Sequence, residues 1–453
     1  MKRHYLYLLF LLPLLLACKP KAPIPQANAG TADFSKFVAI GDGQTAGYMD
    51  DGLSVEGQKN SLGAILQQQL MMVGAPSIEM PWMSDQNIGL SPNGLSRLIL
   101  GYKTDCQGIS SLSPVRYNIQ GETSAFSASA YSSTKKYTNF GVPGLRMIDM
   151  VSTAFGNINL PQHNAFFARM SKDQFNLPGS GSFSSLQENI FDGGFPTFCS
   201  IYLGIEDVLP YARSGATQNP MSPLAGFPGV GFEESLGQLC EQLAAQNVKA
   251  VIATIPNISD WPFFNTIPYN GLNLDAENAA SLNQIYNPLG FSFVVGANPF
   301  MVADPNAGMF GVRPAVPGEK ILLTAPLDSV KCNQMGSIFP FRNEFVLTLA
   351  ELNEIQNRID LFNAAIRQKA TAYGFALVET GAFYDKLSSG FTYNGASLSA
   401  TFVSGGAFSL DGIHLNSRGN ALLANEFIKA INKTFTAKIP LINALNYNAI
   451  LFP

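Results

Sequence analysis

The chain has 453 residues, of which 13% are charged and 46% are hydrophobic, and its formal net charge is −4. This length allows about three small domains or one large domain with insertions, and the charged fraction is well below the about 25% of an average soluble domain. No run of like charges is long enough to neutralise a phosphate backbone, so nucleic acid is excluded as an expected partner. The composition suits a globular protein outside the cytoplasm.

The N-terminus has the pattern of a secretion signal. Lys2 and Arg3 precede an apolar stretch that ends at Ala17, and about 12 residues at 1.5 Å each are too short to cross about 30 Å of hydrocarbon. We therefore expect residues 1–17 to be a removed signal peptide. The exit Leu-Leu-Ala, followed by Cys18, resembles the lipobox of bacterial lipoproteins, which implies that the Cys18 thiol is acylated. An ordinary secretory signal with a chance cysteine is the alternative.

Residues 18–33 are rich in proline and alanine and have no apolar periodicity. This composition is typical of a flexible tether, and we expect it to hold a folded domain, residues 34–453, away from the membrane. No later stretch is apolar for long enough to form another membrane span.

The remaining cysteines carry no metal-binding spacing, because each is separated from the next by more than 30 residues. An oxidising compartment permits one or two disulfides, and four cysteines allow three connectivities. Buried free thiols are the alternative, which the apolar surroundings of two of the cysteines favour. The four residues are Cys106, Cys199, Cys240 and Cys332.

Short apolar runs alternate with amphipathic segments along residues 34–433, and this alternation predicts a parallel sheet with right-handed crossovers. Apolar residues at helical spacing define the helices, and short apolar runs that end at loops define the strands. The expected strands are 34–40, 198–203, 248–255 and 375–379, and the expected helices are 61–74, 232–246, 348–373 and 417–433.

Two stretches, about 75–135 and about 262–345, are rich in Gly, Pro, Ser and Asn and do not fit this alternation. Because long structureless loops are rarely idle in a compact domain, we expect them to be insertions that shape a pocket. Five aromatic residues near the expected strand ends could line an apolar groove or could pack in the core. They are Tyr48, Trp82, Trp261, Phe263 and Phe264.

Asp411 and His414 lie three residues apart, directly before the expected helix at 417–433. A carboxylate at this spacing can orient an imidazole and stabilise its protonated form. The alternative is an ordinary loop at the start of a helix. The only other histidine of the expected folded domain, His163, lies in a polar segment with no motif and is expected to be a surface residue.

A glycine-rich loop, Gly-Asp-Gly-Gln-Thr-Ala-Gly-Tyr, follows the first expected strand. Ligands bind at this end of open α/β sheets. A dinucleotide-binding fingerprint would require its third glycine at position 46, where the chain has Ala46. We therefore expect no nucleotide cofactor.

Four segments together resemble the blocks of the SGNH (GDSL-type) hydrolase family. They occur in the order of that family: FVAIGDGQTAGY at 37–48, NFGVPG at 139–144, GIED at 204–207 and DGIH at 411–414. The resemblance implies an α/β fold, a three-layer α/β/α sandwich whose five-stranded parallel sheet has flavodoxin-like order, with the two long insertions. It also implies an esterase or lipase acting on carboxylic esters.

In that family a serine attacks the ester, a histidine is the general base, and an oxyanion hole stabilises the intermediate. Carried over by position, His414 is the base, Asp411 orients it, and the N–H of Gly144 is one oxyanion donor. Two positions depart from the pattern: Gly43 stands where the family has its serine, and Glu206 stands where it has an asparagine donor. Gln44 also replaces the usual leucine. We therefore expect weak or no esterase activity.

Other nucleophiles and cofactors have little support in the sequence. No Gly-x-Ser-x-Gly elbow occurs, and Thr45 is expected to point away from His414. Direct attack by a water between His414 and Glu206 is an open alternative. A metal held by Asp42, Glu206, Asp411 and His414 is a rarer one, so we expect no metal site and no cofactor.

Two functions stay open. The first is a lipid-anchored hydrolase-like protein of the cell envelope, attached to the outer membrane through Cys18. The second is a non-catalytic outer-membrane lipoprotein that uses the former cleft to bind an ester, lipid or glycan ligand, or a protein partner in the outer membrane.

Overall fold

A computed structural model of the chain describes residues 26–127, 136–152, 155, 159–160, 163–171, 185–191 and 194–452. The expected signal peptide, Cys18 and the first part of the tether lie outside these residues. Residues 26–33 of the expected tether are described, and they lie against the end of the last long helix, where the amide of Thr31 donates to Phe435 O over 2.8 Å. Within the described residues, no helix is both long and apolar enough to span a bilayer.

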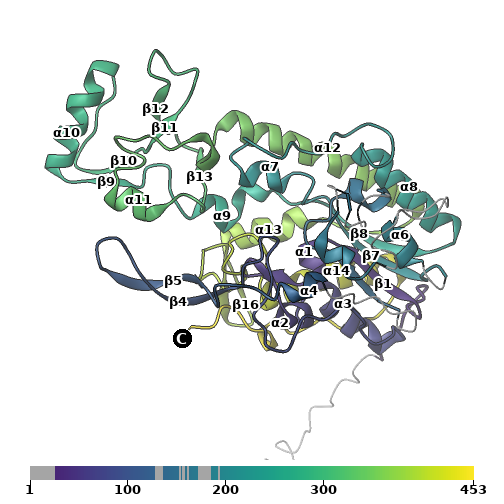
Figure 1. The fold of residues 1–453 in the computed structure, drawn as a ribbon. Helices are drawn as coiled ribbons and strands as arrows, with labels where there is room; N and C mark the ends of the chain where they lie inside the picture. Colours follow the sequence, from purple (N-terminus) through teal and green to yellow (C-terminus); the bar gives the residue numbers. More distant parts are fainter. Residues whose placement is uncertain are drawn as a thin grey trace, which may run out of the picture.

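Five parallel strands form the central sheet (Figure 1). From one edge to the other they are β6 (Asn139–Gly141), β1 (Phe37–Gly41), β7 (Phe198–Tyr202), β8 (Lys249–Ala253) and β15 (Ala376–Val378). Numbered along the chain, this spatial order is 2-1-3-4-5, which is the flavodoxin-like order. The predicted fold class is confirmed.

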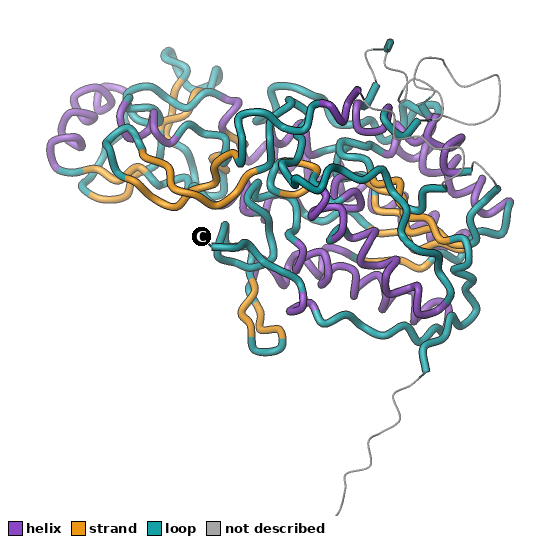
Figure 2. Tube along the Cα trace, turned by 60° about the horizontal axis from the view of Figure 1, so that its bottom comes forward, coloured by secondary structure: helices purple, strands orange, loops and turns teal. Residues whose placement is uncertain are grey.

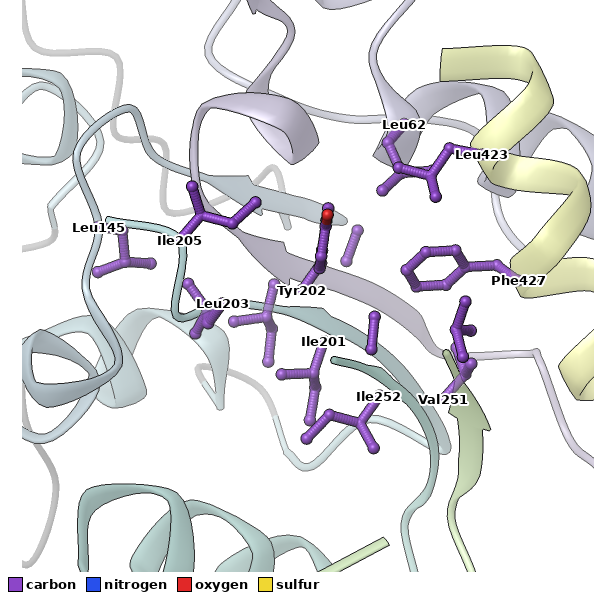
Figure 3. Close-up of a cluster of buried hydrophobic side chains, with 14 of the residues drawn as sticks. Leu62, Leu145, Ile201, Tyr202, Leu203, Ile205, Val251, Ile252, Leu423 and Phe427 are labelled. Atoms are coloured by element: carbon purple, nitrogen blue, oxygen red, sulfur yellow. The ribbon is translucent and has the colours of Figure 1, made fainter. Parts of the chain in front are cut away.

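Helices cover both faces of the sheet, so its strands are buried on both sides and read as continuous apolar runs. On one face lie α3 (Leu62–Leu70) and α14 (Ser417–Phe435), and on the other lie α8 (Phe232–Ala245) and α12 (Leu349–Tyr373). Figure 3 shows Leu62, Leu423 and Phe427 of the first pair around the ring of Tyr202. The four predicted helices are thus present within a few residues of their expected bounds.

The first insertion contains a long antiparallel hairpin, β4 (Leu98–Thr104) and β5 (Ser110–Arg116), which projects from the body (Figures 1 and 2). The second insertion is more ordered than the sequence pattern suggests, because it buries an apolar cluster of its own around Met301 and Phe341. Its strands have only two or three residues each, too few to show a period. They are β9 (Leu272–Leu274), β10 (Gly296–Asn298), β11 (Met301–Ala303), β12 (Val312–Pro314), β13 (Lys320–Ile321) and β14 (Val346–Leu347), with α10 (Ala276–Tyr286) and α11 (Leu327–Cys332).

A disulfide between Cys106 and Cys332 joins the hairpin tip to α11 of the second insertion. Two ion pairs flank it, from Lys103 to Asp328 at 2.9 Å and from Lys331 to Asp105 at 2.7 Å. The other two cysteines, Cys199 and Cys240, are buried free thiols. The four cysteines therefore form one disulfide and two free thiols, an outcome that their spacing alone did not decide.

Short elements complete the fold. They are α1 (Gly43–Ala46), β2 (Tyr48–Met49), β3 (Gly52–Leu53), α2 (Val55–Lys59), α4 (Ser124–Ser127), α5 (Ala165–Ala168), α6 (Ser185–Ile190), α7 (Leu209–Arg213), α9 (Pro262–Asn265), α13 (Thr380–Ser389), β16 (Phe391–Tyr393) and β17 (Ala396–Leu398).

Candidate active site

The sequence blocks converge at the carboxyl ends of three neighbouring strands. The first block continues β1 into α1, the second continues β6, and the third follows β7. The last block is the loop that enters α14, and the side chain of Asn416 caps this helix by accepting from the amide of Gly419. Asp411 and His414 therefore lie on a loop fixed by a helix start, beside the end of β1.

The imidazole of His414 and the carboxylate of Asp411 form a buried pair. His414 Nδ1 lies 2.9 Å from Asp411 Oδ2, and the amides of Ile413 and His414 donate to Asp411 Oδ1 over 2.8 and 2.9 Å. Burial alone would raise the pKa of Asp411, but the neighbouring imidazole and these hydrogen bonds hold it well below its usual range. Asp411 is thus an anion that fixes the ring, and Nε2 is left to face the site.

A tight turn that the sequence analysis missed supports this pair. Asp50 and Asp51 join β2 to β3, and both adopt positive φ angles, 56° and 52°, as a type I′ turn requires. The amide of Asp51 donates to Asp411 Oδ2 over 3.1 Å, and Ser409 Oγ donates to Asp411 Oδ1 over 2.9 Å. The only sequence signal for this turn is the Asp-Asp-Gly run, which carries no family motif.

Gly43 faces His414 directly. A Cβ built on Gly43 would lie 2.9 Å from His414 Nε2 and 3.2 Å from the Cβ of Tyr48. The side-chain direction at position 43 therefore points at the imidazole nitrogen that Asp411 leaves free. Thr45 points elsewhere, because its hydroxyl occupies the space beside Gly41 of β1, as the sequence predicts.

Two carboxyl groups flank the imidazole. Asp42 is buried, and its Oδ1 accepts from the amide of Gln44 over 3.0 Å; burial, and then Glu206, raise its pKa to about 7. Burial also raises the pKa of Glu206, which is half-buried and has no hydrogen-bond partner among the described residues. Burial would lower the pKa of His414, but Asp411, Glu206 and Asp42 together raise it above its usual value.

A small cavity of about 10 Å³ separates these groups. Two buried polar atoms of residues that line it, Asp42 Oδ2 and Trp261 Nε1, have no hydrogen-bond partner among the described residues. This volume is about the minimum that can hold one water molecule. The residues around it are Asp42, Gln44, Ile205, Glu206, Trp261, Tyr384, Ile413 and His414.

Backbone donors of the site are also placed. Gly43 opens α1, so its N–H has no partner within that helix. Gly144 is exposed just beyond β6, with a φ of 81° that favours glycine. Gln44, which replaces the family's leucine, is buried and joins two segments: its Nε2 donates to Asn420 Oδ1 over 2.7 Å, and its Oε1 accepts from the amide of Leu415.

Most of the other sequence candidates do not line the cavity, but Trp261 does, and Tyr48 packs against His414. His163 is exposed, as expected, and its Nδ1 lies 2.8 Å from Leu160 O. Of the aromatic candidates, Trp82 is partly exposed while Tyr48, Trp261, Phe263 and Phe264 are buried, and only Trp261 lines the cavity. Among the described residues no three His, Cys, Asp or Glu side chains are arranged to hold a metal ion.

Comparisons with known proteins place the chain in a family. The model of the GDSL-like lipase/acylhydrolase family matches residues 37–427. Two solved structures are similar over most of their length: an α/β-hydrolase enzyme from the metagenome of Lake Arreo, Spain (14% identity, 88% of this chain, 96% of that chain, TM-score 0.36), and a chain from Parabacteroides merdae assigned to the GDSL-like lipases (11% identity, 89% and 99%, TM-score 0.32). No curated protein matches. Since the family model spans most of the sequence and the four blocks meet at one end of the sheet, this chain belongs to the GDSL-like lipase/acylhydrolase family.

Proposed function

We propose that the protein is a lipid-anchored GDSL-family protein of the cell envelope that forms no acyl-enzyme, and whose ester hydrolysis is weak and depends on His414. One observation carries the proposal: the side-chain direction at Gly43 points at His414 Nε2 from a distance of 2.9 Å. This is the place of a nucleophile paired with its base, and glycine supplies no nucleophile there.

The charge at Glu206 supports the same proposal. An ionised carboxylate only accepts hydrogen bonds, so it repels a developing oxyanion where an amide side chain would stabilise it. Loss of one oxyanion donor typically lowers the rate by about 10²–10³. The N–H groups of Gly43 and Gly144 are then the donors that the site retains.

The membrane anchor rests on the lipobox-like end of the signal segment at Cys18. Several acyl chains on one cysteine give stable attachment, whereas a single chain binds a membrane only marginally. Residues 19–25 would then connect the anchor to the described domain, which places the domain close to the outer membrane. Radiolabelled palmitate incorporation that is lost in Cys18→Ala would support the anchor; equal incorporation in both would contradict it.

Hydrolysis of short and medium acyl p-nitrophenyl esters by residues 19–453 tests the activity. We expect slow turnover that His414→Ala abolishes and that His163→Ala leaves unchanged, because His163 lies outside the site. Rates equal to background in the unaltered chain would refute the hydrolytic part of the proposal.

A second candidate function is binding without turnover. The observation that favours it is a pair of buried atoms at the former site, Asp42 Oδ2 and Trp261 Nε1, for which the described part of the chain offers no hydrogen-bond partner. A ligand of the ester, lipid or glycan class, retained with equal affinity by the unaltered chain and by His414→Ala and not turned over by either, would establish this function in place of hydrolysis.

A further inference from the structure

We propose that one water molecule, held in the cavity by Asp42, Glu206 and Trp261, is the nucleophile of this site and that His414 is its general base. This inference rests on the proposed function, since it names the attacking group of the weak hydrolysis. It replaces a two-step reaction through an acyl-enzyme with a single displacement by water.

The cavity has the size and polarity of a water site. Its volume of about 10 Å³ is close to the minimum that holds one water molecule, and such a water needs two to four polar partners. Asp42 Oδ2 and Trp261 Nε1 are both buried and lack partners among the described residues. Each residue is 2% exposed, and a buried polar atom that is left unpaired destabilises the folded state.

The hydrogen-bonding groups around the cavity match those of water. Trp261 Nε1 only donates, so it saturates one lone pair of the water. Asp42 Oδ2 and Glu206 both accept, and together they bind and orient one proton of the water, which leaves its second proton for His414 Nε2. When His414 is neutral and Asp411 accepts from its Nδ1, Nε2 carries a lone pair and can take a proton from the water. The second lone pair of the water is then free to attack.

The reaction balances without any other reagent. The water oxygen bonds to the ester carbonyl carbon while one of its protons moves to His414 Nε2, and the carbonyl electron pair becomes an oxyanion near the amides of Gly43 and Gly144. Collapse of this intermediate breaks the bond to the alcohol oxygen, which takes the proton from Nε2. One ester and one water give one acid and one alcohol, and His414 ends neutral.

Protonation of His414 sets the pH dependence of this reaction. The imidazole must be neutral to accept a proton, and Asp411, Glu206 and Asp42 face it from the last, third and first blocks. The ring of Tyr48 packs on it, with centroids 4.9 Å apart. Turnover should therefore rise with pH through the raised pKa of His414. The positive charges of Arg213 and Arg146 in turn lower the pKa of Glu206 and so oppose the effect of its burial.

Each group that holds the water has a conservative variant. Trp261→Phe removes the donor and keeps most of the ring, and Trp82→Phe is its matched control because Trp82 is the only other tryptophan of the chain. Asp42→Asn keeps the shape and one acceptor oxygen. Glu206→Gln keeps an acceptor and removes the negative charge, with the exposed Glu277 of α10 providing the control Glu277→Gln.

The test is steady-state p-nitrophenyl ester hydrolysis by residues 19–453 across pH 5–9. We expect Trp261→Phe and Asp42→Asn to lower kcat about 10- to 100-fold, as displacement of a reacting group does, with KM little changed and the two controls unaffected. Glu206→Gln should move the pH profile to lower pH, because an anion beside His414 is removed.

The outcomes separate the two claims. No His414-dependent turnover in the unaltered chain overturns the hydrolytic function and this inference together. Turnover that needs His414 but is unchanged in Trp261→Phe and Asp42→Asn, with the pH profile of Glu206→Gln unmoved, overturns the water nucleophile and leaves the proposed function standing. Circular dichroism of each variant establishes that its fold is intact.

Discussion

Restoring a hydroxyl at position 43 tests how much of the family's chemistry the site retains. In Gly43→Ser the new Cβ would lie 2.9 Å from His414 Nε2 and 3.3 Å from its Cδ2. Real Cβ atoms do not approach other atoms this closely, so the imidazole must withdraw by several tenths of an ångström. Its Nδ1 is bonded to Asp411, so the pair must shift together.

The cost of this shift is modest. Overpacking of a filled site costs about 1–3 kcal/mol, and replacing a glycine that has no positive φ returns about 0.4–1 kcal/mol through the unfolded chain. The net loss is then about 0–2.6 kcal/mol. With about 2.1 cal/mol/K of unfolding entropy per residue over roughly 400 residues, the melting temperature falls by only about 0–3 °C. The variant should fold.

Activity is the more informative readout. With Glu206 still in place, Gly43→Ser alone should hydrolyse p-nitrophenyl esters poorly. Adding Glu206→Asn supplies an oxyanion donor, so kcat/KM of the double variant should exceed that of Gly43→Ser by about 10²–10³, with a burst of p-nitrophenol from the acyl-enzyme. Equal rates for the two would refute the placement of Glu206 at the oxyanion. No gain in either, with the fold intact, would refute the view that the rest of the site is preserved.

Three further predictions concern the buried charges and the disulfide. Asp411→Asn should lower the pKa of His414, because Asp411 is the group that raises this pKa most. NMR of the imidazole protons can measure the change, since His163 is the only other histidine of residues 34–453. An unchanged titration would contradict the pairing of Asp411 with His414. The free energy of unfolding, measured in urea, should fall as pH rises from about 4 to 7. The pKa values of Asp42 and Asp207 are raised from 3.8 to about 7 in the folded state, so over this range the folded state binds more protons than the unfolded state. Asp42→Asn should flatten this dependence, and a rise in stability over the same range would refute the prediction. Replacing both cysteines of the disulfide, Cys106→Ser with Cys332→Ser, should lower the free energy of unfolding by about 2–5 kcal/mol and speed proteolysis of the second insertion. The two free thiols, Cys199 and Cys240, should react with thiol reagents only on unfolding, because burial raises the pKa of both. Labelling of either thiol in the native state would contradict this.

Four of the five strands of the main sheet and its four long helices could be predicted from their apolar patterns, whereas β6 (Asn139–Gly141), which has only three residues, could not. Leu423, Phe427 and Ile431 recur every four residues on the buried face of α14, and strands buried on both faces are continuous apolar runs. The second insertion could not be predicted in this way. Its strands are too short to show alternation, and its core joins residues from Ile267 to Val346 that only the folded chain brings together.

In the candidate site, too, some residues could be predicted from the sequence and others could not. The four blocks gave Asp411, His414 and Gly144 by position, and the structure brings the first two into contact. The water-sized cavity could not be predicted from the sequence, because Trp261 lies at the start of an insertion and the surroundings of its side chain depend on the fold. Cys106 and Cys332 lie 226 residues apart, so their pairing could not be read from spacing.

Labelling with a fluorophosphonate, read by intact mass, tests whether any side chain of the site acts as a nucleophile. Because no side chain of the native site is expected to attack a carbonyl or phosphoryl centre, residues 19–453 should gain no mass. Gly43→Ser/Glu206→Asn should gain one phosphonyl group, and adding His414→Ala should remove that gain. A stoichiometric adduct on the unaltered chain, lost in His414→Ala, would mean that another side chain serves as the nucleophile and would contradict the account.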